Sequence, residues 1–146
     1  MDKKILYTGG TFDLFHEGHV NFLRMCKNLA DEVVVSLNTD EFIQSYKGFT
    51  PFHSFEQRKQ ILLSCVHIDR VVSNTGNSDS TESIEKVQPH IIAIGTDWAK
   101  KDYYTQMGFT QQWLDLRNIT LVYLPYTADV SSTIIKEKIA KAYLPQ

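Results

Sequence analysis

The chain lacks several features that mark common classes of protein. Its 146 residues include only two cysteines, Cys26 and Cys65, which we interpret as small core residues of a reducing compartment. The formal net charge is −2 and no basic run is present, so we expect no nucleic-acid partner. No apolar stretch is long enough to span a bilayer and no signal-peptide pattern follows Met1, so we expect no membrane association and a cytoplasmic location.

Two familiar phosphate-binding loops are also missing. Neither the dinucleotide fingerprint G-x-G-x-x-G nor the Walker loop G-x-x-x-x-G-K-[ST] occurs in the chain. No internal repeat or low-complexity linker divides the sequence, and its length fits one compact domain spanning residues 1–146.

Short apolar segments alternate with helical patterns along the chain. This alternation predicts an α/β fold, a Rossmann-like, doubly wound, five-stranded parallel sheet with helices on both faces. Ligands bind such sheets beyond the carboxyl ends of the strands. Strands are predicted at 4–7, 32–37, 70–73, 91–95 and 120–124, helices at 18–30, 54–64, 81–87, 109–116 and 132–142, and loops at 46–48 and 74–80.

A glycine-rich turn at residues 8–10 leads from the first predicted strand towards a predicted helix start. This arrangement points free backbone N–H groups and the positive end of a helix dipole at an anion. His16 and His19 lie at that point, and an imidazole donates to a phosphate oxygen whether it is neutral or protonated. Two histidines at this spacing also suit a metal, but no further cluster completes a site, so we expect no metal held by protein side chains.

The segments Gly10-Thr11-Phe12-Asp13 and His16-Glu17-Gly18-His19 resemble the G-T-F-D and H-x-G-H motifs of the nucleotidyltransferase superfamily. Further segments resemble the small glycerol-3-phosphate cytidylyltransferases, and the similarity extends over almost the whole chain. These segments are Thr39 to Phe42, His53 to Lys59, Gly95 to Trp98, Tyr123 to Pro125 and Val130 to Thr133.

The resemblance implies transfer of CMP from CTP, with Mg²⁺, to a small phosphorylated acceptor. Pyrophosphate is released, and the product is a CDP-activated precursor for a surface or capsular polymer. A homodimer is also implied. His16, His19 and Lys47 are the implied catalytic residues, and Lys47 and Arg58 are expected to bind the acceptor. The expected nucleotide-binding residues are Gly10, Thr11, Phe12, His16, His19, Gly95, Asp97, Trp98, Tyr126, Thr127, Val130, Ser131, Ser132 and Thr133.

The chain departs from the family pattern at three positions. Tyr126 stands at an arginine position, Asp129 at a glycine position and Phe49 at a second lysine position. Losing a bidentate arginine should weaken triphosphate binding unless another cation replaces it. Asp129 is expected either to contact Mg²⁺ or to cap the following helix. The candidate replacement cations are Lys47, Arg58, Lys100 and Lys101.

Several alternatives follow from the same residues. Arg58 is either a salt-bridged surface residue or a residue of the binding cleft. The acceptor is glycerol 3-phosphate or another small phosphate compound. The nucleotide is CTP or, as in flavin- and pantetheine-type adenylyltransferases, ATP. A non-catalytic nucleotide-binding module is a third hypothesis, motivated by Tyr126 and Asp129.

Overall fold

The computed structural model describes residues 2–76, 80–96 and 103–145. Its five strands form one sheet in which every neighbouring pair is parallel, in the order β3-β2-β1-β4-β5. The predicted fold class is therefore confirmed. The strands are β1 (Ile5–Gly10), β2 (Glu32–Asn38), β3 (Arg70–Asn74), β4 (Ile91–Gly95) and β5 (Thr120–Leu124).

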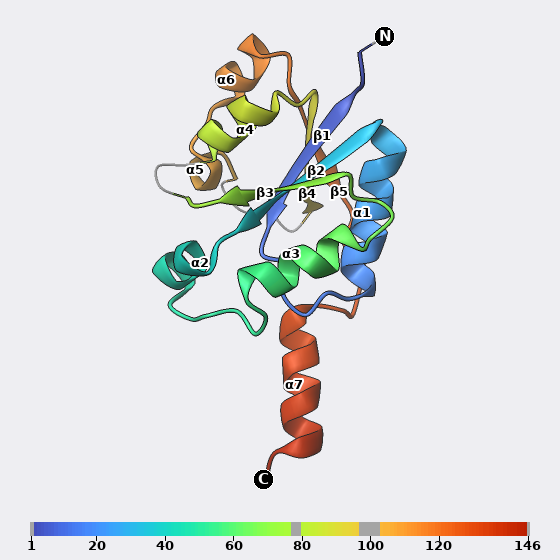
Figure 1. Cartoon of the computed structure of the whole chain (residues 1–146), viewed down its shortest axis with the longest axis vertical. Coiled ribbons are helices and arrows are strands. Elements are labelled where there is room, and N and C mark those ends of the chain that lie inside the picture. The colour runs from blue at the N-terminus through green and yellow to red at the C-terminus, as the bar shows by residue number, and fades with distance from the viewer. Residues whose placement is uncertain (1, 77–79, 97–102, 146) are drawn as a thin grey trace.

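Helices cover both faces of this sheet. Figure 1 shows α4, α5 and α6 gathered on one side of it, with α1 and α3 on the other. The helices are α1 (Glu17–Leu29), α2 (Asp40–Lys47), α3 (Phe55–Leu63), α4 (Thr81–Val87), α5 (Tyr103–Met107), α6 (Gln111–Leu116) and α7 (Ser132–Tyr143).

Alternation along the strands creates two hydrophobic cores. In β2, Val33 and Val35 pack on the side of α1 and α3, whereas Val34 between them packs on the side of α4 to α6. Leu6 and Tyr7 divide in the same way in β1. Because side chains of a strand point alternately to opposite faces, a strand that is apolar throughout becomes buried on both sides.

The structure corrects several predicted boundaries. Strand β1 continues through its two glycines, because Gly9 and Gly10 still pair with β2. The loop predicted at 46–48 is wrong, since Tyr46 and Lys47 are the last residues of α2. Thr39 caps this helix by accepting from Phe42 N at 3.2 Å, and Gly48 ends it with a positive φ of 77°. Helix α5 was also not predicted.

The remaining differences are smaller. Asn74 is the last residue of β3 rather than a loop residue. Helix α6 begins at Gln111 instead of Phe109, because the Thr110 side chain caps it. Cys26 is buried in α1 as expected, whereas Cys65 follows the end of α3 and is half-buried.

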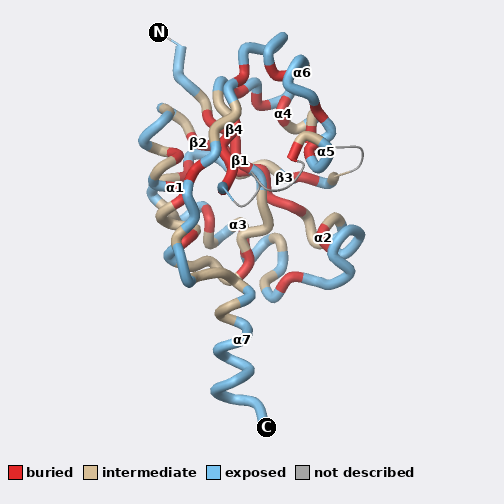
Figure 2. Tube along the Cα trace, turned by 180° about the vertical axis from the view of Figure 1, so that it is seen from behind, coloured by how far each residue is buried: buried red, intermediate tan, exposed pale blue. Residues whose placement is uncertain are grey.

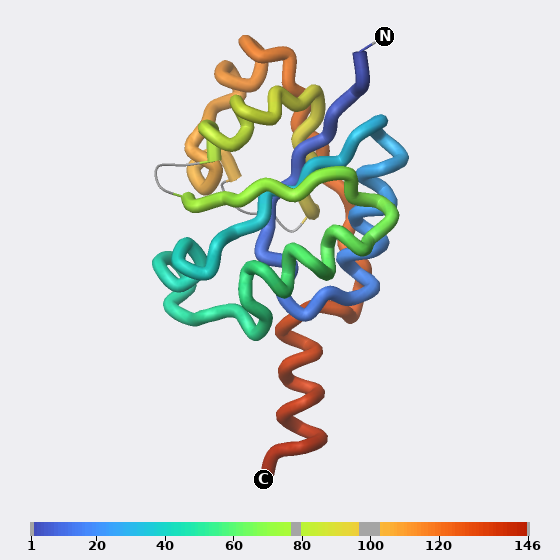
Figure 3. Tube along the Cα trace, viewed as in Figure 1, coloured from blue at the N-terminus to red at the C-terminus, as the bar shows by residue number. Residues whose placement is uncertain are grey.

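Helix α7 projects from the body of the molecule, as Figures 1, 2 and 3 show. None of its 12 residues is buried. Its first turn meets the carboxyl edge of the sheet, and the rest extends away from it. Within the described ranges, no helix combines the length and the apolar character needed to cross a bilayer.

Candidate active site

The predicted site residues that the structure describes lie around the carboxyl ends of β1, β2, β4 and β5. Strand order reverses between β1 and β4, which places a switch point at the centre of the sheet. Open parallel sheets bind ligands outside such a point. The loop after β1, the start of α2 and the segment between β5 and α7 all begin at this edge.

His16 and His19 together form the cap of α1. His16 Nδ1 accepts from Gly18 N at 3.1 Å, and His19 Nδ1 accepts from His16 N at 3.2 Å. The rings stack with their centroids 3.8 Å apart. Because each Nδ1 is an acceptor, the proton of each neutral imidazole lies on Nε2. Both rings are partly exposed, which leaves two Nε2–H donors for a ligand.

The environment keeps both imidazoles neutral. Burial is the largest cause that lowers the pKa of His19 to about 3, and repulsion from a protonated His16 is the second. Burial also lowers the pKa of His16 below its ordinary value, although Glu17 opposes the shift. Both imidazoles are therefore neutral near pH 7. A neutral imidazole protonated at Nε2 can still donate one hydrogen bond from that nitrogen.

Glycine is required between the two histidines. A Cβ on Gly18 would lie 2.9 Å from His16 Cε1 and 3.0 Å from Val130 Cγ1. The ring of His16 thus folds over Gly18, and Val130 closes the space from the segment before α7. Any side chain at this position would displace the imidazole or separate the two segments.

Asp13 joins three segments of the site. Its buried carboxylate accepts from the backbone N–H groups of Leu14, Phe52 and His53, at 2.7 to 3.1 Å. Its carbonyl accepts from Ser132 Oγ at 2.5 Å. Burial alone would raise the pKa of Asp13, but the donors from His53 and Phe52 and the nearby Lys136 lower it below its ordinary value. The carboxylate therefore remains ionised and fixes the loop after β1 against residues 52 and 53, while the Asp13 carbonyl joins the loop to α7.

That loop has strained backbone. Phe12 and Leu14 adopt positive φ angles of 51° and 49°. Bulky residues rarely adopt this conformation, which costs of order 1–3 kcal/mol at each position and is found where surrounding contacts enforce it. Here the bonds of Asp13 enforce it on both sides of the loop.

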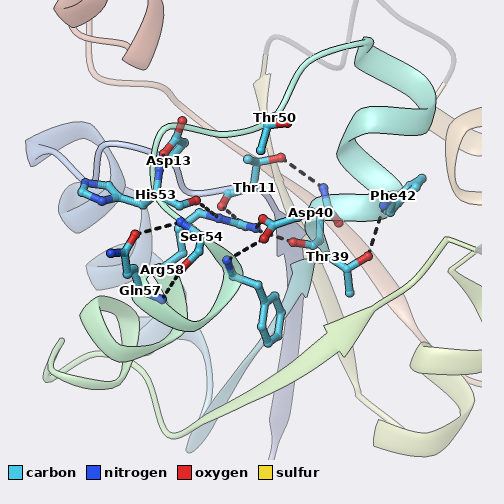
Figure 4. Close-up of polar contacts among 12 residues, drawn as sticks. Thr11, Asp13, Thr39, Asp40, Phe42, Thr50, His53, Ser54, Gln57 and Arg58 are labelled. Atoms are coloured by element: carbon cyan, nitrogen blue, oxygen red, sulfur yellow. Dashed lines mark hydrogen bonds and ion pairs between the residues drawn. The ribbon is translucent and has the colours of Figure 1, made fainter.

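Arg58 is the largest fully buried side chain of the site. Its guanidinium donates to the carbonyl oxygens of Thr11, Asn38 and His53, at 2.9 to 3.1 Å. It also pairs with Asp40 Oδ1 at 2.7 Å. Figure 4 shows these segments converging on the guanidinium. One cation thereby holds the ends of β1 and β2 against the start of α3.

The structure corrects the expectations for Arg58. The residue is 1% exposed, so it is not a surface residue. Its guanidinium donors face carbonyl and carboxylate oxygens of the chain rather than an open cleft, so it positions the site instead of binding the acceptor. Its partners Asn38 and Asp40 were not predicted. Asp40 lies within the Thr39 to Phe42 segment that carried the resemblance, and this was the available signal.

The start of α7 offers backbone donors. Ser131 is the N-cap and accepts from Ile134 N at 3.0 Å, so the alternative in which Asp129 caps the helix is wrong. The N–H groups of Ser132 and Thr133 precede the first intrahelical bond and face the end of the helix. Asp129 has a φ of 62°, which explains how this residue stands at the family's glycine position.

The segment before α7 is fixed to α1 and β4. Thr127 Oγ1 accepts from Asn21 Nδ2 at 2.9 Å. The Tyr126 ring lies against Gly95, since a Cβ there would come 2.1 Å from Tyr126 Cε2. The structure therefore brings Gly95, Tyr126 and Thr127 together at one edge. Asp97 and Trp98, predicted for the same region, and Lys100 and Lys101 lie outside the described residues.

Lys47 reaches the site from the end of α2. Its Nζ lies 5.6 Å from the ring centroid of Tyr46 and 5.9 Å from that of Phe49. All three side chains are exposed. Lys136, which the sequence did not single out, approaches Phe49 and Asp13 from α7.

A second region, a cavity of about 620 Å³ lined by Gln88, Pro89, His90 and Arg117 among others, lies beside the amino ends of β4 and β5, away from these residues.

The sequence matches known proteins along most of its length. The family model described as cytidylyltransferase-like matches residues 7–138. Glycerol-3-phosphate cytidylyltransferase of Bacillus subtilis is 36% identical over 139 residues, which cover 94% of this chain and 98% of that protein. FAD synthase of Pyrococcus horikoshii is 38% identical over 97 residues, which cover 66% of each chain.

Solved structures share the fold. The lipopolysaccharide core biosynthesis protein of Thermoplasma volcanium superimposes with a TM-score of 0.70 at 24% identity, over 86% of this chain and 98% of that one. Pantoate-beta-alanine ligase of Francisella tularensis gives a TM-score of 0.57 at 16% identity, over 99% of this chain and 72% of that one. The family model matches nearly the whole chain, the sheet is parallel, and two histidines cap a helix at its switch point. The protein is therefore a nucleotidyltransferase that belongs to the cytidylyltransferase-like family.

Proposed function

We propose that the protein transfers CMP from CTP to a small phosphorylated acceptor, glycerol 3-phosphate or a related phosphate monoester. An acceptor phosphate oxygen attacks the α-phosphorus in line, the bond from the α-phosphorus to the bridging oxygen breaks, and pyrophosphate leaves. The product is a CDP-linked compound that suits the synthesis of a surface or capsular polymer. The similarity to the Bacillus subtilis enzyme over nearly both full lengths supports this choice.

The pair of neutral imidazoles is the observation that carries the proposal. His16 and His19 present fixed Nε2–H donors at the switch point, beside the first turn of α7. Charge develops on the phosphoryl oxygens as the α-phosphorus becomes five-coordinate, and preorganised donors stabilise that charge. The free N–H groups of Ser132 and Thr133 suit the departing pyrophosphate. No covalent intermediate is needed.

Mg²⁺ fits this site as a partner of the nucleotide. The Asp13 carboxylate already accepts three backbone N–H groups, and Asp40 pairs with Arg58. Within the described residues no three acidic, histidine or cysteine side chains gather as a metal site. Triphosphate oxygens and water are therefore the expected ligands of the ion, which neutralises triphosphate charge when bound.

A second candidate is adenylyl transfer from ATP to a flavin-like phosphate. Similarity to FAD synthases favours it, as do the exposed aromatic residues Tyr46 and Phe49 beside Lys47. The resemblance also implies a homodimer, which light scattering of the purified chain tests directly.

Pyrophosphate release separates these candidates. Each nucleoside triphosphate is supplied with Mg²⁺ against a panel that includes glycerol 3-phosphate and FMN, and products are identified by mass. Release with CTP and a phosphate monoester is the expected result. Release with ATP alone would replace the first proposal by the second, and tight CTP binding without turnover would favour a binding module.

A further inference from the structure

Two buried asparagines connect the end of β3 to the loop after β1. Asn38 and Asn74 are the last residues of β2 and β3, they are paired in register, and they are 8% and 6% exposed. Asn74 Nδ2 donates to Asn38 Oδ1 at 3.2 Å, and Asn38 Nδ2 donates to Thr11 Oγ1 at 3.2 Å. We call Asn74, Asn38 and Thr11 the amide chain.

A backbone group fixes the direction of the amide chain. Gly76 N donates to Asn74 Oδ1 at 3.0 Å, and because a backbone N–H only donates, this acceptor must be the amide oxygen. Asn74 therefore turns its Nδ2 to Asn38, which accepts with Oδ1. The Nδ2 of Asn38 is then left to donate to Thr11 Oγ1, and to the Tyr46 hydroxyl oxygen at 3.4 Å. Every donor in the amide chain is thus determined by the bond from Gly76.

This direction leaves the hydroxyl proton of Thr11 unused. A threonine hydroxyl has one proton and two lone pairs, and here one lone pair accepts from Asn38. Within the part of the chain that the structure describes, Thr11 Oγ1 makes no second hydrogen bond. Arg58 Nη1 donates to the Thr11 carbonyl oxygen at 2.9 Å and holds the residue in place. Thr11 is half-buried and directly follows β1 at the switch point, so its proton is available to a ligand there.

We infer that Asn38 is a positioning residue that keeps the Thr11 hydroxyl as a donor for an anionic oxygen of the nucleotide triphosphate. A hydroxyl that accepts one hydrogen bond donates a second one more strongly, because the two bonds polarise each other. Asn38 acts through Thr11, since both amide protons and the amide oxygen of Asn38 are bonded within the protein. The inference rests on the proposed function, which supplies the nucleotide.

Asn74→Asp reverses the amide chain from a position that does not touch the ligand. A carboxylate still accepts from Gly76 N but cannot donate, so Asn38 must turn Nδ2 to residue 74 and Oδ1 to Thr11. The Thr11 proton then bonds to Asn38 and is lost to the nucleotide. We expect the KM for the nucleotide to rise about tenfold, because a hydrogen bond to a charged group is lost. The acceptor KM should change by less than about twofold, since no contact with the acceptor is removed.

Thr11→Val shows whether this effect passes through the hydroxyl. It removes the hydroxyl group at a similar side-chain shape and should raise the nucleotide KM by a similar factor. Adding Asn74→Asp to Thr11→Val should then change this KM by less than about twofold, because changes that act through one bond are not additive. Equal effects of Asn74→Asp in both backgrounds would assign the loss to the added negative charge and would overturn the inference.

An exposed asparagine offers a control with the same change of charge. Asn118 lies just before β5, at the amino edge of the sheet and away from the amide chain. Asn118→Asp should leave the nucleotide KM within about twofold of the parent, because solvent and salt screen an exposed charge at that distance. A tenfold rise in this variant would also contradict the inference.

Two further measurements keep each failure distinct. Asn38→Asp repeats the test if Asn74→Asp does not fold, because a carboxylate at position 38 accepts the Thr11 proton directly. Calorimetric titration with CTP and Mg²⁺, without an acceptor, needs no turnover, and either variant should weaken CTP binding about tenfold. If the parent chain turns over no nucleotide, the proposed function fails, and the titration still decides the inference. An active Asn74→Asp enzyme with an unchanged nucleotide KM makes the inference alone fail.

Discussion

The His16 and His19 rings stack 3.8 Å apart, and each accepts a backbone hydrogen bond at the start of the same helix. Capping and chemistry therefore use different nitrogens of one residue. Nδ1 accepts from the helix end, and Nε2 is the nitrogen that the proposed function assigns to the substrate.

Substitution can separate these two tasks at His16. Asparagine accepts well at an N-cap but lacks the Nε2–H donor, so His16→Asn should fold normally while turnover falls by roughly 10²- to 10³-fold. Thermal unfolding and pyrophosphate release provide the measurements. Thr110→Ala removes the cap of α6 instead, and it should cost about 1 kcal/mol of stability without a change in kcat. Near-normal turnover in His16→Asn would contradict the assigned role.

The buried histidine makes stability depend on pH. The folded-state pKa of His19, about 3, lies below its unfolded value near 6.5, so the unfolded chain takes up the proton first. The contribution of His19 to the free energy of unfolding is constant above pH 6.5. It is lost as the pH falls from there towards 3, at roughly 1.4 kcal/mol per pH unit for this one proton. Urea unfolding of the parent chain should show this loss. In His19→Asn the slope between pH 6 and 4 should be shallower, and an unchanged slope would refute the assignment.

Removing Arg58 should destabilise the site strongly. Arg58→Met leaves three carbonyl groups and Asp40 without their donor, and breaking a buried ion pair costs about 3–5 kcal/mol. Denaturant unfolding gives the value. The exposed pair of Arg70 and Glu32 is the comparison, and Arg70→Met should cost no more than about 1 kcal/mol. An equal decrease in the free energy of unfolding for the two variants would show that the burial of Arg58 adds nothing to the stability of its ion pair.

Gly18→Ala should impair activity although alanine favours helices. Its Cβ would meet the His16 ring at 2.9 Å and Val130 at 3.0 Å, so the imidazole or the segment before α7 must move. We expect kcat to fall at least tenfold with the fold retained. At Gly9 a Cβ would stand 3.7 Å from its nearest neighbour, Ser36 O, so Gly9→Ala should be tolerated better. Comparable kcat values for both variants would contradict this expectation.

Tyr126→Arg tests the departure from the family pattern. A guanidinium there adds a bidentate phosphate ligand, and about a tenfold lower KM for the nucleotide triphosphate is expected. Tyr126→Phe removes only the hydroxyl group and serves as the control. If the arginine variant binds no more tightly than the phenylalanine variant, another cation already fills this role.

The sequence was sufficient to predict the fold class and the approximate positions of the five strands. Strands such as β4 and β5 are apolar runs bounded by turn residues, so their limits were predicted correctly. Helix α2 was missed because eight residues with one buried side chain, Ile43, carry little periodic signal. Its first turn is held by the local Thr39 cap and by the bond between Asp40 and Arg58, and only the second of these is a tertiary contact.

The roles of individual polar residues were harder to predict. Arg58 stands among polar residues in the sequence, and only the folded chain encloses it beneath the loop after β1. The neutral state of the histidines also depends on burial and on their mutual contact, which spacing alone does not reveal. Lys136 had no signal as a site residue, since it lies in a helix that is otherwise exposed.

The strained loop after β1 has a consequence for the thermodynamics of binding. Phe12 and Leu14 keep their left-handed backbone beside Asp13, whose carboxylate is bonded to the N–H groups of Leu14, Phe52 and His53. The conformational entropy of this loop is therefore lost during folding, before any substrate arrives. If this loop binds the nucleotide as proposed, the binding free energy is not diminished there by a disorder-to-order transition.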